Sequence, residues 1–295
     1  MAFESPAEIS PASAPKVVEF LPRTLPVELH RDIVQNIDDR ATLLALCTTS
    51  CAFKVEAERM LYRSMTQNLA QADVDKAIHL SFLQTMANAK HLAALVRTYH
   101  LQVAKVCILS ANAQREFSDL IRSALRSMVN LCRLWLDLPS SVMRPDPFIF
   151  DHCSFQLESL QITQTQTTHE LTAFLGTQRR LRELSVNLDN SVQPVPAAVC
   201  PHLEVLQGNR NTMNALLPRR QIKTLIYDPD TYEMNEPVSH LSEPLDHLLV
   251  LSLGGFYLRP SLHILTSFLR SLEYLELVSL HGRSTLSVSC DPFVD

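Results

Sequence analysis

The segment LESLQI at residues 157–162 is one of seven that follow the form L-x-x-L-x-L, with other residues at a few of its positions. The middle leucines of these segments are separated by 26, 24, 22, 19, 26 and 24 residues. Leucine-rich amphipathic helices also produce this form by chance, but seven occurrences at so regular a period favour a repeat. The segments are LCRLWL (131–136), LESLQI (157–162), LRELSV (181–186), LEVLQG (203–208), IKTLIY (222–227), LLVLSL (248–253) and LEYLEL (272–277).

A repeat of about 20–29 residues with this form is typical of leucine-rich repeats, in which each unit adds one short strand to a parallel sheet. Alternate side chains of each strand face a shared core, and the rest of the unit returns through a helix or turn. Apolar residues at helical spacing at 117–128 and 171–175 predict such returns, and LVRTYHLQV at 95–103 predicts an earlier, irregular strand. We therefore predict an α/β solenoid over residues 67–295, an irregular leucine-rich-repeat horseshoe with short parallel strands.

The turns of the predicted repeats depart from the usual pattern. An asparagine three residues after the last leucine normally satisfies backbone groups at the turn, but here it occurs only as Asn211, with Asp189 and Asp230 as possible replacements. We expect the turns to be held by other contacts. The chain ends 18 residues after the seventh segment, so either SVSCDPFVD (287–295) caps the array or the C-terminal cap is missing.

The N-terminal part has a different pattern. Residues 1–23 are rich in proline, alanine, serine and glutamate, which predicts a disordered lead-in. Pro26 and Glu28 are typical of the first turn of a helix, whose apolar stripe is Leu29, Ile33 and Ile37. Asp38 or Asp39 can cap a second helix, and Thr49 or Ser50 a third. Residues 24–66 are thus predicted to form a three-helix unit.

Three such short helices cannot cover all of their own apolar side chains. Some of Leu25, Leu29, Ile33, Leu43 and Leu46 should therefore remain exposed, and exposed apolar patches usually mark a protein interface. The alternative is that residues 67–100 fold back over the patch, so that the unit is an N-terminal cap on the larger domain.

Residues 24–66 resemble an F-box. The resemblance lies in an ordered set, with Phe53 where many members carry tryptophan: Leu25-Pro26, Glu28-Leu29, Ile33, Ile37-Asp38, Leu43, Leu46, Ser50, Phe53, Ala57 and Leu61-Tyr62-Arg63. The closing AERMLYRSM is similar to the end of this motif in many fungal F-box proteins. The resemblance implies that the chain is the substrate-recognition subunit of an SCF-type ubiquitin ligase, and that it reaches a cullin-RING ligase through a Skp-type adaptor. The implied adaptor contacts are Leu25, Pro26, Leu29, Ile33, Ile37, Leu43 and Leu46.

Alternation along the predicted strands turns the residues between the leucines toward the concave face of the sheet. Trp135, the only tryptophan in the chain, lies between Arg133 and Asp137, and tryptophan and arginine are enriched at binding hot spots. Trp135 could instead pack beneath the preceding helix. The candidate residues for binding a client protein are Arg133, Trp135, Asp137, Gln161, Glu183, Asn187, Gln207, Asp228 and Tyr274.

Several classes of function are disfavoured by the sequence. Common nucleotide-binding, hydrolase and zinc-protease motifs do not occur, and 5 glycines leave little room for phosphate-binding loops, so we expect neither catalysis nor a cofactor. With 26 basic and 31 acidic residues the chain has no basic stripe for nucleic acid. A ligase-independent scaffold or regulatory binding protein is the alternative function.

The cysteines and the N-terminus indicate the compartment. Seven scattered cysteines are untypical of a disulfide framework, and most are expected to be buried. His152-Cys153 and Cys200 near His202 lack a second ligand pair, so no metal site is predicted. With no signal peptide or long apolar run, we expect a soluble protein of the cytoplasm or nucleus without a membrane partner.

Overall fold

The computed structural model divides the chain into two compact units, with the boundary between Ala57 and Glu58. The sequence predicted a boundary after residue 66. The residues that the structure describes are 26–68, 73–103, 111–138, 148–163, 168–188, 194–228, 247–254, 269–278 and 285–289. The predicted disordered lead-in, residues 1–23, lies outside them.

The N-terminal unit contains α1 (Val27–Gln35), α2 (Arg40–Leu46) and the first half of α3 (Cys51–Arg63). Of the two candidates for each predicted cap, the structure uses Asp39 and Ser50. The Asp39 carboxylate accepts hydrogen bonds from the backbone N–H groups of Ala41 (3.4 Å) and Thr42 (2.7 Å). The pKa of Asp39 is lowered, mainly by the hydrogen bond that its carboxylate accepts from the Thr42 hydroxyl. The two bonds from backbone N–H groups lower it further. The Ser50 hydroxyl accepts from the N–H of Phe53 at 3.3 Å, at the start of α3.

The core of the N-terminal unit is small. Among its described residues only three apolar side chains are buried, namely Val34, Leu43 and Ala57. His30 packs its ring edge-to-face against Phe53 with centroids 4.7 Å apart. A unit of this size is marginal on its own, because so little of its surface is removed from water.

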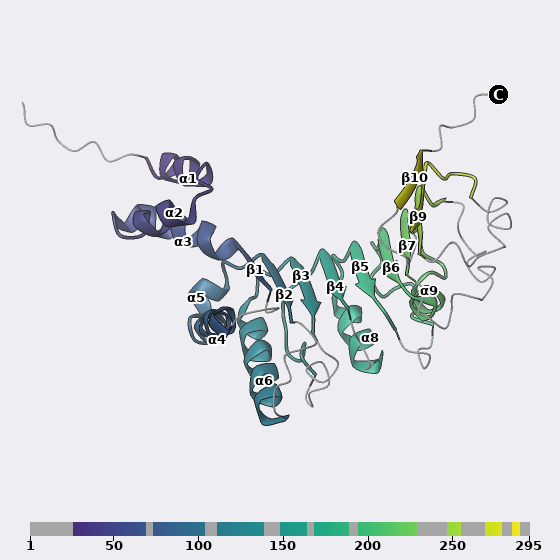
Figure 1. Ribbon diagram of the computed structural model, residues 1–295, viewed down its shortest axis with the longest axis horizontal. Coiled ribbons are helices and arrows are strands. Elements are labelled where there is room, and N and C mark those ends of the chain that lie inside the picture. The colour runs from purple at the N-terminus through teal and green to yellow at the C-terminus, as the bar shows by residue number, and fades with distance from the viewer. Residues whose placement is uncertain are drawn as a thin grey trace, which may run out of the picture. The chain divides into compact units, whose positions relative to one another are not determined.

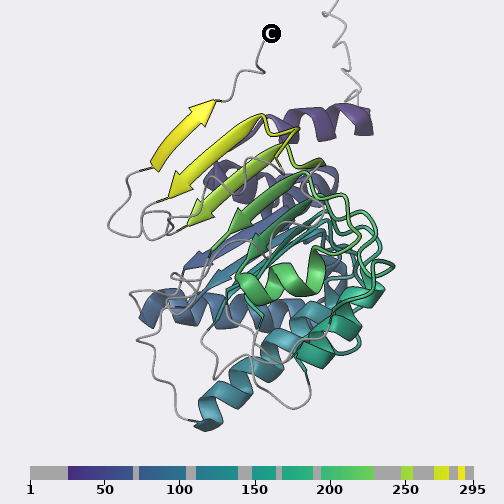
Figure 2. The same cartoon turned by 90° about the vertical axis from the view of Figure 1, so that its right-hand side faces the viewer.

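The second unit is built on one sheet whose strands follow one another in chain order (Figures 1 and 2). β1 to β9 pair in parallel and β10 pairs antiparallel with β9, an open α/β arrangement compatible with a solenoid. The strands are β1 (Ser64–Asn68), β2 (Thr98–Gln102), β3 (Arg133–Asp137), β4 (Ser159–Ile162), β5 (Glu183–Val186), β6 (Val205–Gly208), β7 (Thr224–Tyr227), β8 (Val250–Gly254), β9 (Tyr274–Val278) and β10 (Thr285–Ser289).

Each of the seven repeated segments supplies one strand, as predicted, and the irregular strand predicted at 95–103 is β2. Strand pairing places the middle leucines of all seven segments opposite one another in a single row: Leu134, Leu160, Leu184, Leu206, Leu225, Leu251 and Leu275. The first six are at most 2% exposed. β1 was not predicted, because its sequence SMTQN lacks the leucine pattern.

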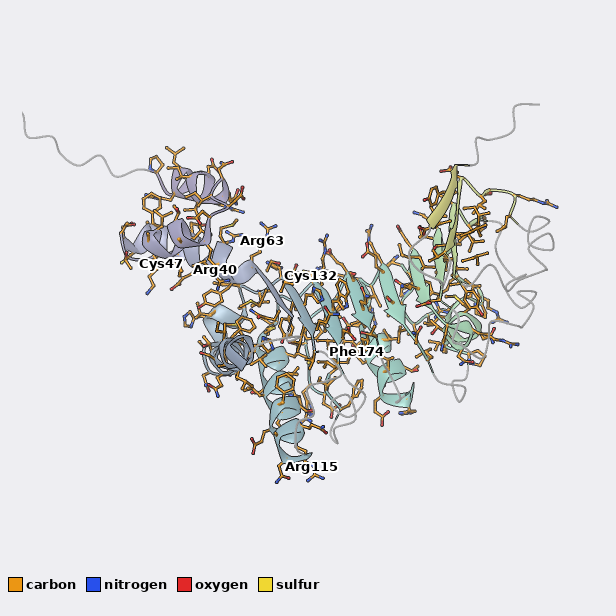
Figure 3. The ribbon with its side chains drawn as sticks, viewed as in Figure 1. Arg40, Cys47, Arg63, Arg115, Cys132 and Phe174 are labelled. Atoms are coloured by element: carbon orange, nitrogen blue, oxygen red, sulfur yellow. The ribbon has the colours of Figure 1, made fainter. Side chains whose placement is uncertain are left out.

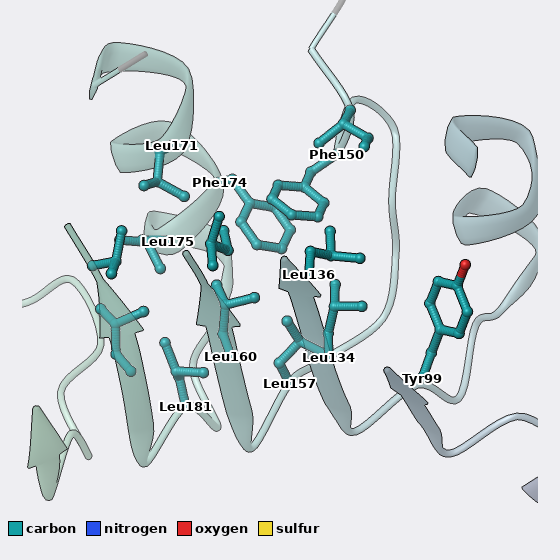
Figure 4. Close-up of a cluster of buried hydrophobic side chains, with 14 of the residues drawn as sticks. Tyr99, Leu134, Leu136, Phe150, Leu157, Leu160, Leu171, Phe174, Leu175 and Leu181 are labelled. Atoms are coloured by element: carbon teal, nitrogen blue, oxygen red, sulfur yellow. The ribbon is translucent and has the colours of Figure 1, made fainter. Parts of the chain in front are cut away.

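The described helices of this unit lie on one face of the sheet (Figure 1). Figure 4 shows Leu171, Phe174 and Leu175 of α8 above Leu136 and Leu160 of the strands. Phe174 also stacks on Phe150, with centroids 4.5 Å apart. The helical returns predicted at 117–128 and 171–175 are thus confirmed. The helices are α4 (Asp73–Asn88), α5 (Lys90–Ala93), α6 (Ala111–Ser127), α8 (Thr168–Thr177) and α9 (Arg210–Leu216).

Of the turns at which other contacts were expected, those at 139, 165, 189, 230, 256 and 280 lie outside the described residues. In the described loops that precede the strands, polar side chains bond the backbone. The side chain of Gln178, 1% exposed, accepts a hydrogen bond from the N–H of Leu157 at 2.9 Å. The Arg220 guanidinium is also buried and donates to the carbonyl oxygens of Val195, Pro196 and Val199 at 3.3, 2.7 and 3.0 Å. Long polar side chains thus satisfy backbone groups that would otherwise be buried without partners.

The turn after β6 uses two asparagines. Asn209 and Asn211 both donate to the carbonyl of Leu188, at 2.9 and 3.2 Å. Asn209 also accepts from the N–H of Thr212 at 3.1 Å and so caps α9. Alternation predicts that Asn209 faces outward, but it is 3% exposed, because the strand ends at Gly208 and the chain turns at once into α9. Asp189 and Asp230 lie outside the described residues.

Gly208 occupies the last position of its leucine segment, where most other segments have a large apolar residue. A Cβ at Gly208 would lie 2.1 Å from the carbonyl oxygen of Val186 and 2.8 Å from the Thr212 side chain. The close approach of α9 to the sheet therefore requires glycine here. The step from Leu206 to the next middle leucine is also the shortest, at 19 residues.

We expect Gly208→Ala to lower the free energy of unfolding by about 3 kcal/mol or more, because the strand or α9 must move to make room. The matched control is Gly176→Ala in α8, where nothing lies within 4 Å of the added Cβ. The control should be neutral or stabilising by up to about 1 kcal/mol. Urea denaturation of both variants measures the difference. Equal, small changes in the free energy of unfolding of the two variants would contradict the close packing of α9 against the sheet.

A buried histidine–tyrosine pair lies under α4. The Tyr99 hydroxyl is 3.0 Å from Nε2 of His79, and both side chains are fully buried beside Phe82 and Phe117. Burial lowers the pKa of His79 to about 4 and raises that of Tyr99. The imidazole is therefore neutral, and the direction of its hydrogen bond with the tyrosine hydroxyl follows the imidazole tautomer.

His79 binds its proton less readily in the folded chain than in the unfolded chain. The free energy of unfolding should therefore decrease as the pH is lowered. The loss begins near the unfolded pKa of 6.5 and is complete below about 4. Between pH 7 and pH 5 the chain should lose about 2 kcal/mol more than His79→Gln, which cannot titrate. Urea midpoints at both pH values measure this difference. Parallel pH profiles for the two proteins would contradict the buried neutral histidine.

Candidate functional site

Two surfaces carry the residues that the sequence predicted for binding. The first consists of exposed apolar residues of the N-terminal unit, whose helices and side chains are drawn in Figure 3. Leu29 and Ile33, one turn apart on α1, are 44% and 43% exposed. Such large apolar side chains side by side on one helix are costly to leave in water unless a partner covers them.

The other predicted adaptor residues are placed differently. Pro26 is exposed, and Ile37 and Leu46 are half-buried. Leu25 lies outside the described residues. Leu43 is only 6% exposed, so its side chain belongs to the small core and is not presented to a partner.

Two exposed apolar residues of this unit were not predicted, Leu44 at 54% and Val55 at 62%. α2 carries adjacent leucines at 43 and 44, and the sequence pattern does not show which of them faces inward. The structure buries Leu43 and exposes Leu44.

The second surface is the face of the sheet opposite the helices, which we call the open face. It consists of the strand residues that alternate with the buried leucines. Its central row, in which Ser252 alone is buried, is His100, Trp135, Gln161, Ser185, Gln207, Ile226, Ser252 and Glu276. None of the nine predicted client-binding residues is buried. Arg133, Trp135, Glu183 and Asp228 are exposed, whereas Asp137, Gln161, Asn187, Gln207 and Tyr274 are half-buried.

Trp135 lies on the open face and is 40% exposed, so it does not pack beneath the preceding helix. Its indole stacks on the imidazole of His100, with centroids 3.9 Å apart and planes 6° apart. The two rings face each other because His100 and Trp135 are paired across β2 and β3. This contact fixes the orientation of the indole.

A carboxylate lies beside this aromatic pair. Gln102 and Asp137 are the next pair along β2 and β3 on the same face, and the Gln102 amide donates to Oδ2 of Asp137 at 3.0 Å. Burial lowers the pKa of His100, and the charge of Asp137 opposes that shift with a smaller effect. Sequence analysis missed His100 and Gln102, because β2 carries only part of the leucine pattern.

The strands of the open face carry more acidic than basic side chains. Arg133 is the single basic residue at the face positions of the described strands β2 to β9, whereas Asp137, Glu183 and Glu276 are acidic. Asp228, exposed just after β7, adds a further acid. The residues just before the strands mix both signs, for example Lys223 and Glu204, which form an ion pair at 3.4 Å.

The cysteines differ from expectation. Most were predicted to be buried, but of the five that the structure describes only Cys200 is; Cys47, Cys132 and Cys153 are half-buried and Cys51 is exposed on the first turn of α3. Burial raises the pKa of Cys153 to about 12 and that of Cys200 to about 11, so both thiols are protonated at pH 7. Within the described ranges no three metal-ligating side chains come together.

Comparison of the sequence with known protein families gives no match, and comparison with curated proteins gives none either. Among the described helices, none combines the length and the apolar composition needed to span a bilayer.

The stacked pair predicts a pH-dependent fluorescence signal. Trp135 is the only tryptophan, and a protonated imidazole in van der Waals contact quenches indole emission by accepting an electron. Because burial lowers the pKa of His100, emission should fall with a midpoint below pH 6.5. His100→Gln should abolish the transition, and His79→Gln should leave it unchanged. A midpoint above 6.5 would show that the charge of Asp137 affects the pKa of His100 more than burial does. A transition that persists in His100→Gln would exclude the stacked pair as its source.

Proposed function

We propose that the chain is the substrate-recognition subunit of an SCF-type ubiquitin ligase. In this proposal the N-terminal helices are an F-box that binds a Skp-type adaptor, and the sheet is a leucine-rich-repeat domain that binds a client protein. The ordered F-box residues of the sequence support the first part, and the regular leucine segments support the second. The observation that carries the proposal is the exposure of Leu29 and Ile33 on a helix of a unit in which only three apolar side chains are buried among the described residues.

The physical argument is one of incomplete burial. A little under half of each side chain of Leu29 and Ile33 faces water, so a partner groove that covers them gains about 1 kcal/mol from each. An amphipathic helix laid into an apolar groove is a recurrent mode of protein recognition. Leu44 and Val55, also exposed on this unit, extend the apolar area that such a partner can cover.

The chain itself would supply no catalytic group. Ubiquitin transfer would belong to the conjugating enzyme and the RING subunit, which the adaptor connects to the chain through a cullin. The contribution of the chain is proximity, since holding the client near the charged conjugating enzyme raises the effective concentration of its lysines. Such a subunit needs no cofactor and acts in the cytoplasm or nucleus.

The test is co-expression of the full chain with a Skp-type adaptor, followed by affinity capture of the adaptor. The chain should be captured in stoichiometric amount. The double substitution Leu29→Asp/Ile33→Asp should abolish capture, because two carboxylates would be buried without partners in the groove. Circular dichroism checks that the variant is folded.

Ile78→Asp is the matched control. Ile78 is also apolar, is 54% exposed and lies on a helix, but belongs to the second unit, so its substitution should leave capture unchanged. Failure of the folded wild-type chain to bind the adaptor would contradict the proposal and favour a ligase-independent scaffold that uses the open face alone.

A further inference from the structure

We propose that the client binds the open face through an extended, cationic segment, with one lysine or arginine held between Trp135 and Asp137. This inference rests on the proposed function, because it specifies the chemistry of the client that the repeat sheet receives. It is carried by the geometry of the His100–Trp135 stack, by the hydrogen bond that orients Asp137, and by the excess of acids on the face.

The aromatic pair is an ordered platform for a cation. Indole is the most favourable side chain for cation–π contacts, and Trp135 keeps 40% of its surface exposed. His100 covers one face of the indole, and an incoming cation meets the part of the ring that stays exposed. Because the stack already holds the ring in place, binding loses little side-chain entropy.

Asp137 supplies a carboxylate in a fixed orientation. Gln102 occupies Oδ2, and among the described residues nothing donates to Oδ1. Asp137 lies two residues after Trp135 on the same strand, so the two side chains project in parallel about 7 Å apart. A guanidinium, with several donors in a planar fork, can bond the free oxygen while it lies against the indole.

The charges on the face favour a basic segment over an acidic or phosphorylated one. A phosphate placed at Trp135 would meet Arg133 on one side and Asp137 on the other. The attraction and the repulsion would largely cancel, so the charges would add little to its binding free energy. Further along the sheet it would meet Glu183 and Glu276, with no second basic side chain on the described strands to balance them. A basic segment is attracted along the same path.

The spacing of the acids also constrains the client. Glu183 lies on β5 in the row of Arg133 and Ser159, two strands across and two residues along from Trp135, which is about 12 Å. An extended segment in the polyproline II conformation has three residues per turn and rises about 3.1 Å per residue, so side chains three positions apart project from the same side about 9 Å apart. Basic residues three positions apart in an extended client segment can therefore reach Trp135 with Asp137 and then Glu183.

The experiment measures binding of a fluorescein-labelled serine peptide with arginine at every third position to the full chain. Two matched peptides carry citrulline or glutamate in place of arginine; citrulline keeps the shape and removes the charge. The arginine peptide should bind at least about tenfold more tightly than the citrulline peptide. Its binding should also change the emission of Trp135, the single tryptophan, which locates the contact.

Asp137→Asn should weaken the arginine peptide about tenfold, because it removes the charge and keeps the shape. The matched control is Glu170→Gln, which removes an exposed acid of α8 on the other side of the sheet and should leave affinity unchanged. Trp135→Ala should abolish the emission signal and weaken binding, and circular dichroism checks that it folds.

Four results would overturn the inference: equal affinity for the arginine and citrulline peptides, tighter binding of the glutamate peptide, equal losses in Asp137→Asn and Glu170→Gln, or no binding of any peptide to the folded chain. Adaptor capture is measured on the same preparations. Peptide binding without adaptor capture contradicts the proposed ligase function and leaves the cationic site standing. Adaptor capture without peptide binding contradicts only the cationic site.

Discussion

The second unit depends on one constraint, the row of leucines that occupies the same register position on every strand from β3 to β9. Successive side chains of a strand point to opposite faces, so a slip of one residue would move a leucine to water and a polar residue into the core. The row therefore fixes the register of each strand against the next. It also decides which residues form the open face, since these are the positions between the leucines.

The segments between the strands are free to vary because they carry no such constraint. Steps of 19 to 26 residues separate the middle leucines, and the returns are closed in different ways. The buried side chain of Gln178 accepts a hydrogen bond from the backbone N–H of Leu157. The Arg220 guanidinium donates to the carbonyl of Pro196 in another loop. The shortest return is possible only because Gly208 lets α9 lie directly against the sheet. Irregular turns thus coexist with a regular sheet.

The sequence predicted the features that depend on local pattern. The leucine period located seven strands, and short polar residues located the caps at Asp39 and Ser50. The same alternation placed Trp135 and its neighbours on one face, although it could not decide whether a helix covers them. Features that depend on distant, non-periodic contacts were missed, such as β1, the His79–Tyr99 pair and the stack of His100 on Trp135. Leu43 and Leu44 show that the sequence pattern cannot always decide which residue of a helix is buried, because two adjacent leucines fit the inward position equally well.

If the chain works as proposed, the exposed leucine and isoleucine of α1 contact an adaptor while the open face stays available for a client. Hydroxyl-radical footprinting with mass spectrometry measures this directly, because leucine, isoleucine and tryptophan side chains are all reactive when exposed. A Skp-type adaptor should protect Leu29 and Ile33 and leave the reactivity of Trp135 unchanged. Protection of Trp135 with unchanged Leu29 and Ile33, or no protection of any of the three, would contradict the proposed function.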